Sequence, residues 1–282
     1  MAGVDDMSMQ PIRAAFFDLD KTLIPGSSLF LLARAMYERD LFRARDILGF
    51  AWGQMLFRLR GEAADDIDRT KTSTLEFVAG RSQQELVSWG QEIARERIFP
   101  RVYQDIVQVI EHHKERGDLT FLVTAAPIEL AQVIADELEM TGAVATVSEV
   151  DEAGFYTGRL AGPIMHGQEK AKAVAEMVDL HGLDLAECAA YSDSINDLPL
   201  LEAVGYPHAV NPERELRRIA MTRGWPVHEL RTRRRALLIG IPAGLGGATL
   251  FGGGIALGAA LERRRARRAE GRVERIARRY RI

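Results

Sequence analysis

Pairs of acidic side chains follow two short apolar stretches of this 282-residue chain. Asp18 and Asp20 are separated by one leucine, and Asp193 precedes Asp197 by four positions, with Asn196 beside the second carboxylate. Carboxylates so close together repel one another, and a bound divalent cation relieves that repulsion. Mg²⁺ suits such a site because it takes oxygen ligands and is commonly held by one or two carboxylates plus a phosphate.

A hydroxyl residue and a lysine are candidates for holding that phosphate. Thr124 ends another apolar stretch, and the small residue Ala125 after it would let backbone N–H groups approach an anion. Lys170 begins a predicted helix and could balance the carboxylates, with Lys172 as its rival. Each also has a structural explanation, since Thr124 could cap the next helix and either lysine could lie on a solvated helix face.

The elements that must position these residues alternate between strands and helices. Four short apolar runs predict buried strands of a parallel sheet, at 13–18, 119–124, 143–147 and 188–191. Patterns typical of helices lie between them, at 101–116, 128–139 and 170–181. This alternation predicts an α/β fold with a doubly wound, Rossmann-like parallel sheet. In such sheets ligands bind outside the carboxyl ends of the strands, where the candidate residues lie.

A helical insertion interrupts the predicted core. Residues 27–100 lack strand signals and carry apolar side chains at helical spacing, in 28–39, 41–60 and 83–97. The expected organisation is a leader at 1–11, a catalytic core at 12–26 and 101–230, this cap at 27–100, and a C-terminal segment at 231–282. Residues 154–162 are predicted to form a small β-hairpin before the helix that contains Lys170.

The ordered set of Asp18, Asp20, Thr124, Lys170 and the acidic pair near residue 193 resembles the four motifs of the haloacid dehalogenase (HAD) superfamily. The helical insertion resembles its cap, and the order is similar to the phosphoserine-phosphatase-like subfamily. The resemblance covers about residues 13–229 and implies a phosphatase. Asp18 would be the nucleophile, Asp20 the general acid and base, and Thr124, Ala125 and Lys170 would hold the phosphoryl group.

The same resemblance implies a magnesium site. Asp18 and Asp193 would bind Mg²⁺ together with the backbone carbonyl of Asp20, while Asn196 and Asp197 would orient the phosphate, the lysine and metal-bound water. Two positions depart from the subfamily. Lys21 stands where serine is usual, and Ser27 stands where a glutamate that reads a substrate amino group is expected. These departures argue against phosphoserine as the substrate.

The C-terminal segment has a different character from the rest of the chain. Residues 236–261 contain no charged side chain and eight glycines. As a helix they would measure about 39 Å, which exceeds a hydrocarbon core of roughly 30 Å. The segment is therefore predicted to span a membrane or to form a re-entrant hairpin; a soluble glycine-rich linker is the alternative. Gly240 and Gly244, and likewise Gly254 and Gly258, have the Gly-xxx-Gly spacing that permits helix–helix association.

Charge supports a membrane partner. From Arg231 onward there are 14 arginines and 3 glutamates, a balance of +11, so the net charge of −3 leaves −14 on the first 230 residues. Such a basic tail predicts binding to anionic lipids, and the acidic body offers no surface for nucleic acid. The single cysteine, Cys188, excludes an intrachain disulfide and is compatible with a cytoplasmic catalytic domain.

Three functions remain open from the sequence. The leading one is a membrane-associated, Mg²⁺-dependent phosphomonoesterase that acts on a small phosphomonoester or a lipid phosphate through an aspartyl phosphate. The second is a phosphoserine phosphatase, and the third is a non-catalytic, membrane-tethered scaffold. A scaffold would need none of the candidate residues, which favours an enzyme.

Overall fold

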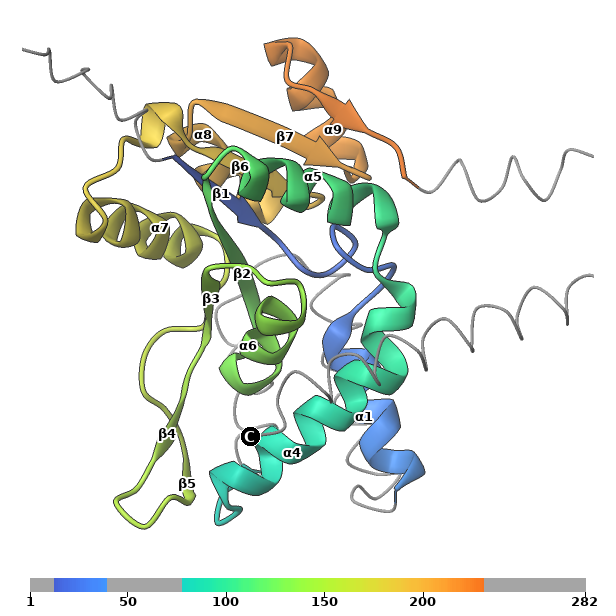
Figure 1. The fold of residues 1–282 in the computed structure, drawn as a ribbon, viewed down its shortest axis with the longest axis vertical. Helices are drawn as coiled ribbons and strands as arrows, with labels where there is room; N and C mark the ends of the chain where they lie inside the picture. Colours follow the sequence, from blue (N-terminus) through green and yellow to red (C-terminus); the bar gives the residue numbers. More distant parts are fainter. Residues whose placement is uncertain (1–12, 40–77, 231–282) are drawn as a thin grey trace, which may run out of the picture. The chain divides into compact units, whose positions relative to one another are not determined.

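The computed structural model describes residues 13–39 and 78–230, which form a parallel sheet flanked by helices and a helical cap (Figure 1). The sheet has six strands in the order β3-β2-β1-β6-β7-β8, and every neighbouring pair is parallel. The strands are β1 Ala14–Phe17, β2 Leu119–Pro127, β3 Gly142–Thr146, β6 Ala189–Ser192, β7 Tyr206–Val210 and β8 Val227–His228. The predicted α/β class and parallel sheet are confirmed.

Strand β1 lies in the middle of the sheet and is buried on both faces. Ala15 and Phe17 belong to one apolar cluster, whereas Ala14 and Phe16 belong to another. Because successive side chains of a strand point to opposite faces, an unbroken run of four apolar residues supplies both layers at once. This explains why the stretch before Asp18 contains no polar residue.

Helices cover both faces of the sheet. Helices α5 Gln104–Glu115 and α6 Ile128–Glu137 supply the cluster that contains Phe17. Helices α7 Gln168–Leu180, α8 Leu198–Ala203 and α9 Arg214–Arg223 supply the cluster that contains Phe16. The predicted helices are thus present, with ends shifted by a few residues. The first of them begins at Gln104 because a short 3₁₀ turn, Phe99–Arg101, precedes it.

Two cap helices fall within the described residues. Helix α1 Ser28–Glu38 packs on α4 Gln83–Ile93 through Ala35, Met36 and Ile93. Helix α4 approaches α6 closely at Gly90, where a Cβ would lie 3.5 Å from the carbonyl oxygen of Glu129. A π-helical turn, Ala94–Ile98, then carries the chain towards the core. The third predicted cap helix, residues 41–60, lies outside the described residues.

The structure corrects several predicted elements. The hairpin is formed by β4 Ser148–Val150 and β5 Tyr156–Leu160, so its first strand precedes the predicted range of 154–162. Strand β2 continues past Thr124 to Pro127, with a register shift against β3 between these two residues. Strands β7 and β8 were not predicted. Pro207 and His208 interrupt the apolar pattern of β7, and β8 has only two residues.

The predicted leader and C-terminal segment, residues 1–11 and 231–282, lie outside the described residues, as do both Gly-xxx-Gly pairs. Among the residues that the structure does describe, no helix combines the length and the apolar character needed to cross a bilayer. The predicted span at 236–261 therefore stays a prediction.

A buried polar network runs across one face of the sheet. His113 Nδ1 lies 2.7 Å from Asp118 Oδ2, and His113 Nε2 lies 2.9 Å from the Tyr191 hydroxyl. The Tyr191 ring stacks on His208 at 4.5 Å, and His208 Nδ1 lies 3.1 Å from His228 Nε2. All of these side chains except His228 border a cleft of about 490 Å³ that also reaches Ala14, near the amino ends of the strands. This cleft is separate from the acidic pairs, which follow the carboxyl ends.

The network predicts a loss of stability in mild acid. Burial, followed by the neighbouring His228 and His113, lowers the pKa of His208 to about 4. Below the ordinary histidine pKa of about 6.5 the unfolded chain binds the proton more readily, so this contribution is complete above pH 6.5 and is lost as the pH falls towards 4. His208→Phe keeps an aromatic ring for stacking on Tyr191 and removes the titration.

We expect the free energy of unfolding of the wild type to fall by about 2 kcal/mol more than that of His208→Phe between pH 7 and pH 4.5, after allowance for partial exposure. Urea denaturation at a series of pH values measures this difference, and His181→Gln, an exposed histidine, is the control. Parallel pH profiles for His208→Phe and the wild type would contradict the assignment.

Candidate active site

Strand register brings the predicted residues to one edge of the sheet. Phe17 of β1 is paired with Leu122 of β2 on one side and with Tyr191 of β6 on the other. Asp18 follows Phe17 directly, and Thr124 and Asp193 come two residues after the two partners of Phe17. The backbone N–H of Asp18 donates to the carbonyl oxygen of Tyr191 at 2.9 Å. The pairing of β1 with β2 and β6 therefore brings Asp18, Thr124 and Asp193 to the same edge of the sheet.

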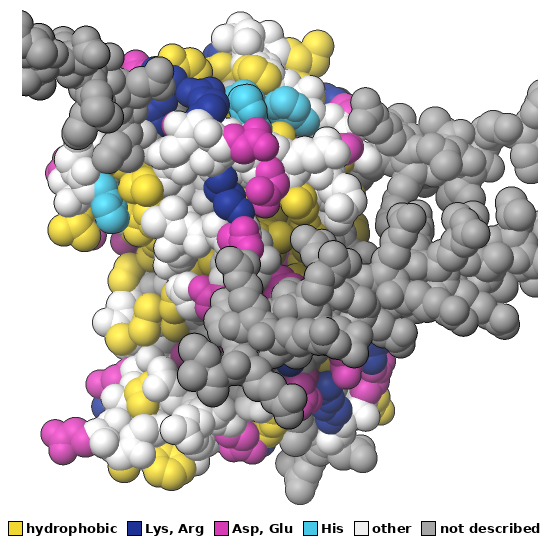
Figure 2. Space-filling view, in the orientation of Figure 1, with side chains coloured by type: hydrophobic (Ala, Val, Ile, Leu, Met, Phe, Trp, Pro, Cys, Tyr) yellow, Lys and Arg dark blue, Asp and Glu magenta, His cyan; other side chains and the backbone are white. Residues whose placement is uncertain are grey.

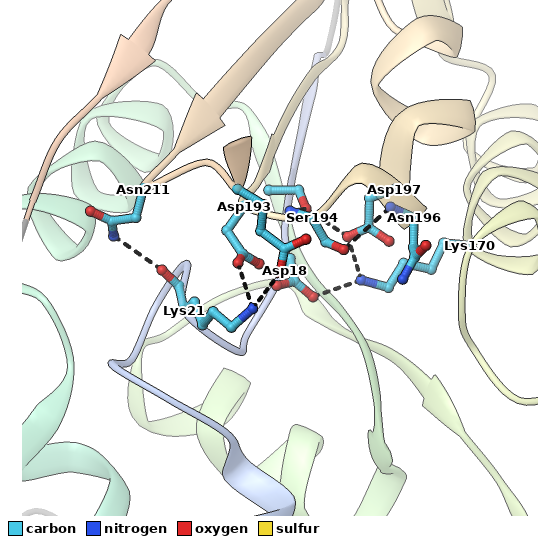
Figure 3. Close-up of polar contacts among 10 residues, drawn as sticks. Asp18, Lys21, Lys170, Asp193, Ser194, Asn196, Asp197 and Asn211 are labelled. Carbon is cyan, nitrogen blue, oxygen red and sulfur yellow. Dashed lines mark hydrogen bonds and ion pairs between the residues drawn. The ribbon is translucent and has the colours of Figure 1, made fainter. Parts of the chain in front are cut away.

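Lys170 joins the two acidic motifs (Figure 3). Its Nζ lies 2.6 Å from Asp18 Oδ1 and 2.8 Å from Asp197 Oδ2, and all three side chains are buried. Ser192 Oγ donates a further hydrogen bond to Asp197 Oδ2 at 2.7 Å. By contrast, Lys172 is exposed and pairs with Glu169 on its own helix. The geometry therefore places Lys170, and not Lys172, beside the acidic residues.

Asp20 connects the core with the cap. Its Oδ1 accepts a hydrogen bond from the backbone N–H of Ser28 at 2.8 Å, at the first turn of α1. Ser27 is the N-cap of that helix, and its hydroxyl accepts from the N–H of Phe30 at 3.3 Å. A partly buried carboxyl is thus held at the point where the cap begins. Position 27, where the family resemblance predicts a glutamate, is thus occupied by a serine that caps helix α1.

Thr124, Ala125 and Asn196 also lie at this edge. Thr124 is buried, and its Oγ1 accepts from the N–H of Ala126 at 3.2 Å. The Ala125 carbonyl oxygen accepts from the Thr146 hydroxyl at 2.9 Å. Asn196 lies in the short 3₁₀ turn Ile195–Asp197, directly before Asp197. Thr124 and Ala125 thus lie on β2, the strand paired with β1, and Asn196 lies beside Asp197 in the chain, while their role in binding phosphate remains a prediction.

Asp193 has a cationic neighbour that the sequence analysis did not assign. Lys21 Nζ lies 3.2 Å from Asp193 Oδ2 and 2.6 Å from Glu213 Oε1. The contact with Asp193 is an ion pair and is longer than the hydrogen bond to Glu213, and Asp193 Oδ2 is buried. Figure 2 shows acidic and basic side chains gathered together on the face of the molecule in view.

Burial and charge crowding shift the proton equilibria of the carboxyl groups. Burial, together with Asp197 and Asp193, raises the pKa of Asp18 to about 8 against the opposing charge of Lys170. Burial likewise raises the pKa of Asp193 to about 6, although Lys21 opposes it. Burial also raises the pKa of Asp20. Burial disfavours the ammonium of Lys170, but its two carboxylate partners outweigh this and raise its pKa above the usual range.

The donor set fits a hard divalent cation. Among the described residues, Asp18, Asp193 and Asp197 form ion pairs with two lysines, Lys21 and Lys170, so the carboxyls would exceed the ammonium groups in charge once a bound cation favours their ionised forms. All the available donors are oxygens, and Asp193 Oδ2 has unused accepting capacity. The described residues contain no cluster of three or more histidine, cysteine or acidic side chains arranged to hold a metal. Two carboxylates suit Mg²⁺, which keeps several waters.

Sequence reasoning missed Ser192, Lys21 as a partner of Asp193, and Glu213. Ser192 directly precedes Asp193 at a strand end, and that position was a usable signal. Glu213 follows the unpredicted strand β7, so no sequence pattern connected it with the site. Its backbone N–H donates to the Asp193 carbonyl oxygen at 2.9 Å.

Comparison with known proteins assigns the family. Residues 15–202 match the haloacid dehalogenase-like hydrolase family. The chain belongs to this family. Phosphoserine phosphatase SerB1 of Mycobacterium tuberculosis is 42% identical over 255 residues, which cover 90% of this chain and 82% of that protein. The predicted family and enzyme class are confirmed: this HAD-like hydrolase has relatives named as phosphatases.

Two solved structures support the fold. A protein of unknown function from Bordetella pertussis Tohama I is 33% identical, with a TM-score of 0.70, and the match covers 78% of this chain and 100% of that chain. A phosphoserine phosphatase studied as a phospho-aspartyl intermediate analogue is 18% identical, with a TM-score of 0.55, over 81% of this chain and 99% of that one. Because the second structure is only 18% identical, its similarity supports the fold of this HAD hydrolase and not its substrate.

The contacts of Lys170 lead to a stability prediction. Lys170→Met leaves Asp18 and Asp197 buried without their cation, and losing one partner of a buried ion pair costs about 3 kcal/mol or more. We expect that loss in the free energy of unfolding, measured by urea denaturation in EDTA. Lys172→Met is the matched control and should change the value by less than about 0.5 kcal/mol, because its ion pair is exposed. Equal effects of the two substitutions would refute the placement of Lys170.

Proposed function

We propose that this HAD hydrolase is a Mg²⁺-dependent phosphomonoesterase that works through a phosphorylated Asp18. The observation that carries the proposal is the buried arrangement of Lys170 between Asp18 and Asp197, with Asp193 on the adjoining strand end. An anionic nucleophile, a fixed cation and a second metal-binding carboxylate are the parts that phosphoryl transfer requires, since this reaction depends mainly on positioning and charge stabilisation.

In the first step, an oxygen of Asp18 attacks the phosphorus and the bond between phosphorus and the leaving oxygen breaks. Lys170, 2.6 Å from Asp18, is placed to offset negative charge on the transferring group. Asp20 gives its proton to the leaving oxygen. A raised pKa favours this role, and burial raises the pKa of Asp20. An alcohol leaves, and an acyl phosphate remains on Asp18.

In the second step, water attacks the phosphorus of the acyl phosphate. Asp20, now ionised, accepts the proton of that water, and the bond to Asp18 breaks to release inorganic phosphate and the free carboxylate. One difficult displacement is thereby divided into two easier ones. The hydrogen bond from the Ser28 N–H holds Asp20 in place for both proton transfers.

Mg²⁺ would be held by Asp18, Asp193 and the backbone carbonyl of Asp20, where it would supply positive charge for the phosphoryl oxygens. Without such a cation, burial and neighbouring carboxylates favour protonated Asp18, with a pKa of about 8, and a protonated carboxyl is a poor nucleophile. A divalent cation would favour the ionised form. Asp197 holds Lys170 from the opposite side.

The proposed substrate is a small phosphomonoester, and O-phosphoserine is the first compound to test. The M. tuberculosis relative named phosphoserine phosphatase supports that choice. Ser27, at the start of the predicted cap, argues against phosphoserine as the substrate. It has no carboxylate to bind a substrate amino group, and its hydroxyl caps α1. A lipid phosphate is the second class to test, on the strength of the apolar C-terminal segment alone.

Hydrolysis of p-nitrophenyl phosphate by the full chain tests the chemistry. We expect turnover that requires Mg²⁺ and is abolished by EDTA, and Asp18→Asn should lower kcat at least about a thousandfold because the nucleophile is lost. Asp179→Asn, at an exposed position of α7, is the control and should leave kcat unchanged. Full activity of Asp18→Asn would disprove the proposed nucleophile.

Membrane association is part of the same proposal and rests on residues 236–261 and the arginine-rich tail, with the catalytic domain in the cytoplasm. We expect the full chain to remain in the membrane pellet after an alkaline carbonate wash, since apolar insertion, unlike charge attraction alone, survives that treatment. Deletion of residues 236–282 should release the protein. Recovery of the full chain in the wash would rule out an inserted segment.

A further inference from the structure

Lys21 occupies an unusual place for a cation in a site built to bind a cation. Its Nζ reaches Asp193, the carboxylate proposed to bind Mg²⁺ (Figure 3), at 3.2 Å from Oδ2. The same Nζ lies 2.6 Å from Glu213 Oε1. The side chain is 28% exposed, whereas that of Asp193 is 4% exposed. A positive charge therefore reaches from the more open side of the site to a buried metal-binding carboxylate.

The backbone holds Lys21 in this position. Lys21 has a φ of 60°, a left-handed conformation that is unfavourable for a residue with a Cβ. Two hydrogen bonds of the Lys21 backbone compensate for it, and a third fixes the asparagine that makes one of them. The Lys21 N–H donates to Gly26 O at 3.2 Å, Asn211 Nδ2 donates to Lys21 O at 3.0 Å, and Asn211 Oδ1 accepts from the N–H of Leu230 at 2.9 Å. The turn is thus tied to the loop after β7.

Glu213 belongs to the same loop and completes the arrangement. Its backbone N–H donates to the carbonyl oxygen of Asp193, and its carboxylate accepts from Lys21 Nζ. Glu213 thereby competes with Asp193 for the charge of Lys21. Because the contact of Lys21 with Glu213 is the shorter one and a carboxylate has about four lone-pair sites, Asp193 keeps accepting capacity for another cation.

We propose that Lys21 is a built-in counter-ion of Asp193 that weakens metal binding, and that Glu213 limits this effect by drawing the lysine away. The inference rests on the proposed Mg²⁺ site. Lys21 would neutralise part of the acidic cluster while the metal is absent, and Mg²⁺ would have to bind against its charge. Lys21 is thus a positioning residue whose charge tunes metal affinity.

Two explanations of Lys21 predict opposite results. If its charge opposes the metal, removing that charge strengthens Mg²⁺ binding, because like charges a few ångströms apart repel. If Lys21 serves only to hold Asp193 in place, removing it lets the carboxylate move and weakens binding. Removing the charge of Glu213 should weaken binding under the first explanation, since Lys21 then turns fully to Asp193.

Titration calorimetry of the full chain with MgCl₂, in the absence of substrate, separates these explanations. We expect Lys21→Met to bind Mg²⁺ about tenfold more tightly than the wild type and Glu213→Gln to bind severalfold more weakly. Lys21→Asn is the second variant, since asparagine tolerates the left-handed backbone and also lacks the charge. Lys172→Met, an exposed lysine on α7, should leave the affinity unchanged.

Asp193→Asn separates the two levels of the proposal. Loss of Mg²⁺ binding in this variant supports the metal site, and retention of wild-type affinity would overturn it. If Asp193→Asn loses Mg²⁺ while both Lys21 variants bind with wild-type or weaker affinity, the metal site stands and the counter-ion role of Lys21 is refuted.

Discussion

Repulsion among buried carboxylates is the constraint on which this structure depends. Asp18, Asp193 and Asp197 are each less than a tenth exposed, and the sheet brings them to one edge. Such a cluster is stable only with compensating positive charge. Lys170 compensates Asp18 and Asp197 from one side, and Lys21 compensates Asp193 from the other. In the proposed reaction, ionised carboxylates would attract a divalent cation, and that cation together with Lys170 would stabilise the negative charge that develops on the phosphoryl oxygens.

The rest of the fold can be understood as the support for that cluster. An uninterrupted apolar β1 buries both faces of the central strand, so that Asp18 can follow it without a flexible linker. Parallel pairing with β2 and β6 places the carboxyl ends of three strands side by side. The cap enters at Ser28, whose N–H holds Asp20. The proposed acid and base of the reaction is thereby connected to the first helix of the predicted cap.

Sequence reasoning predicted the central sheet because its strands are apolar on both faces, a pattern that only a covered parallel sheet explains. It also predicted the residues that gather at the site, since each follows such a strand or begins a helix. It missed β7 because Pro207 and His208 interrupt the apolar pattern of that strand. Without β7, it could not place the following loop, which carries Glu213, beside the site. It could not choose between Lys170 and Lys172 by pattern alone; burial of Lys170 in the fold separates the two.

The proposed covalent intermediate can be tested directly. Mixing the full chain with a hydrolysed phosphomonoester and Mg²⁺, and reducing the acid-quenched protein with borohydride, converts an aspartyl phosphate to homoserine at the position that carried it. Peptide mass spectrometry should find homoserine at position 18 only when substrate and Mg²⁺ are both present. Homoserine at another acidic residue, or none at any position during active turnover, would contradict the proposal that Asp18 receives the phosphoryl group.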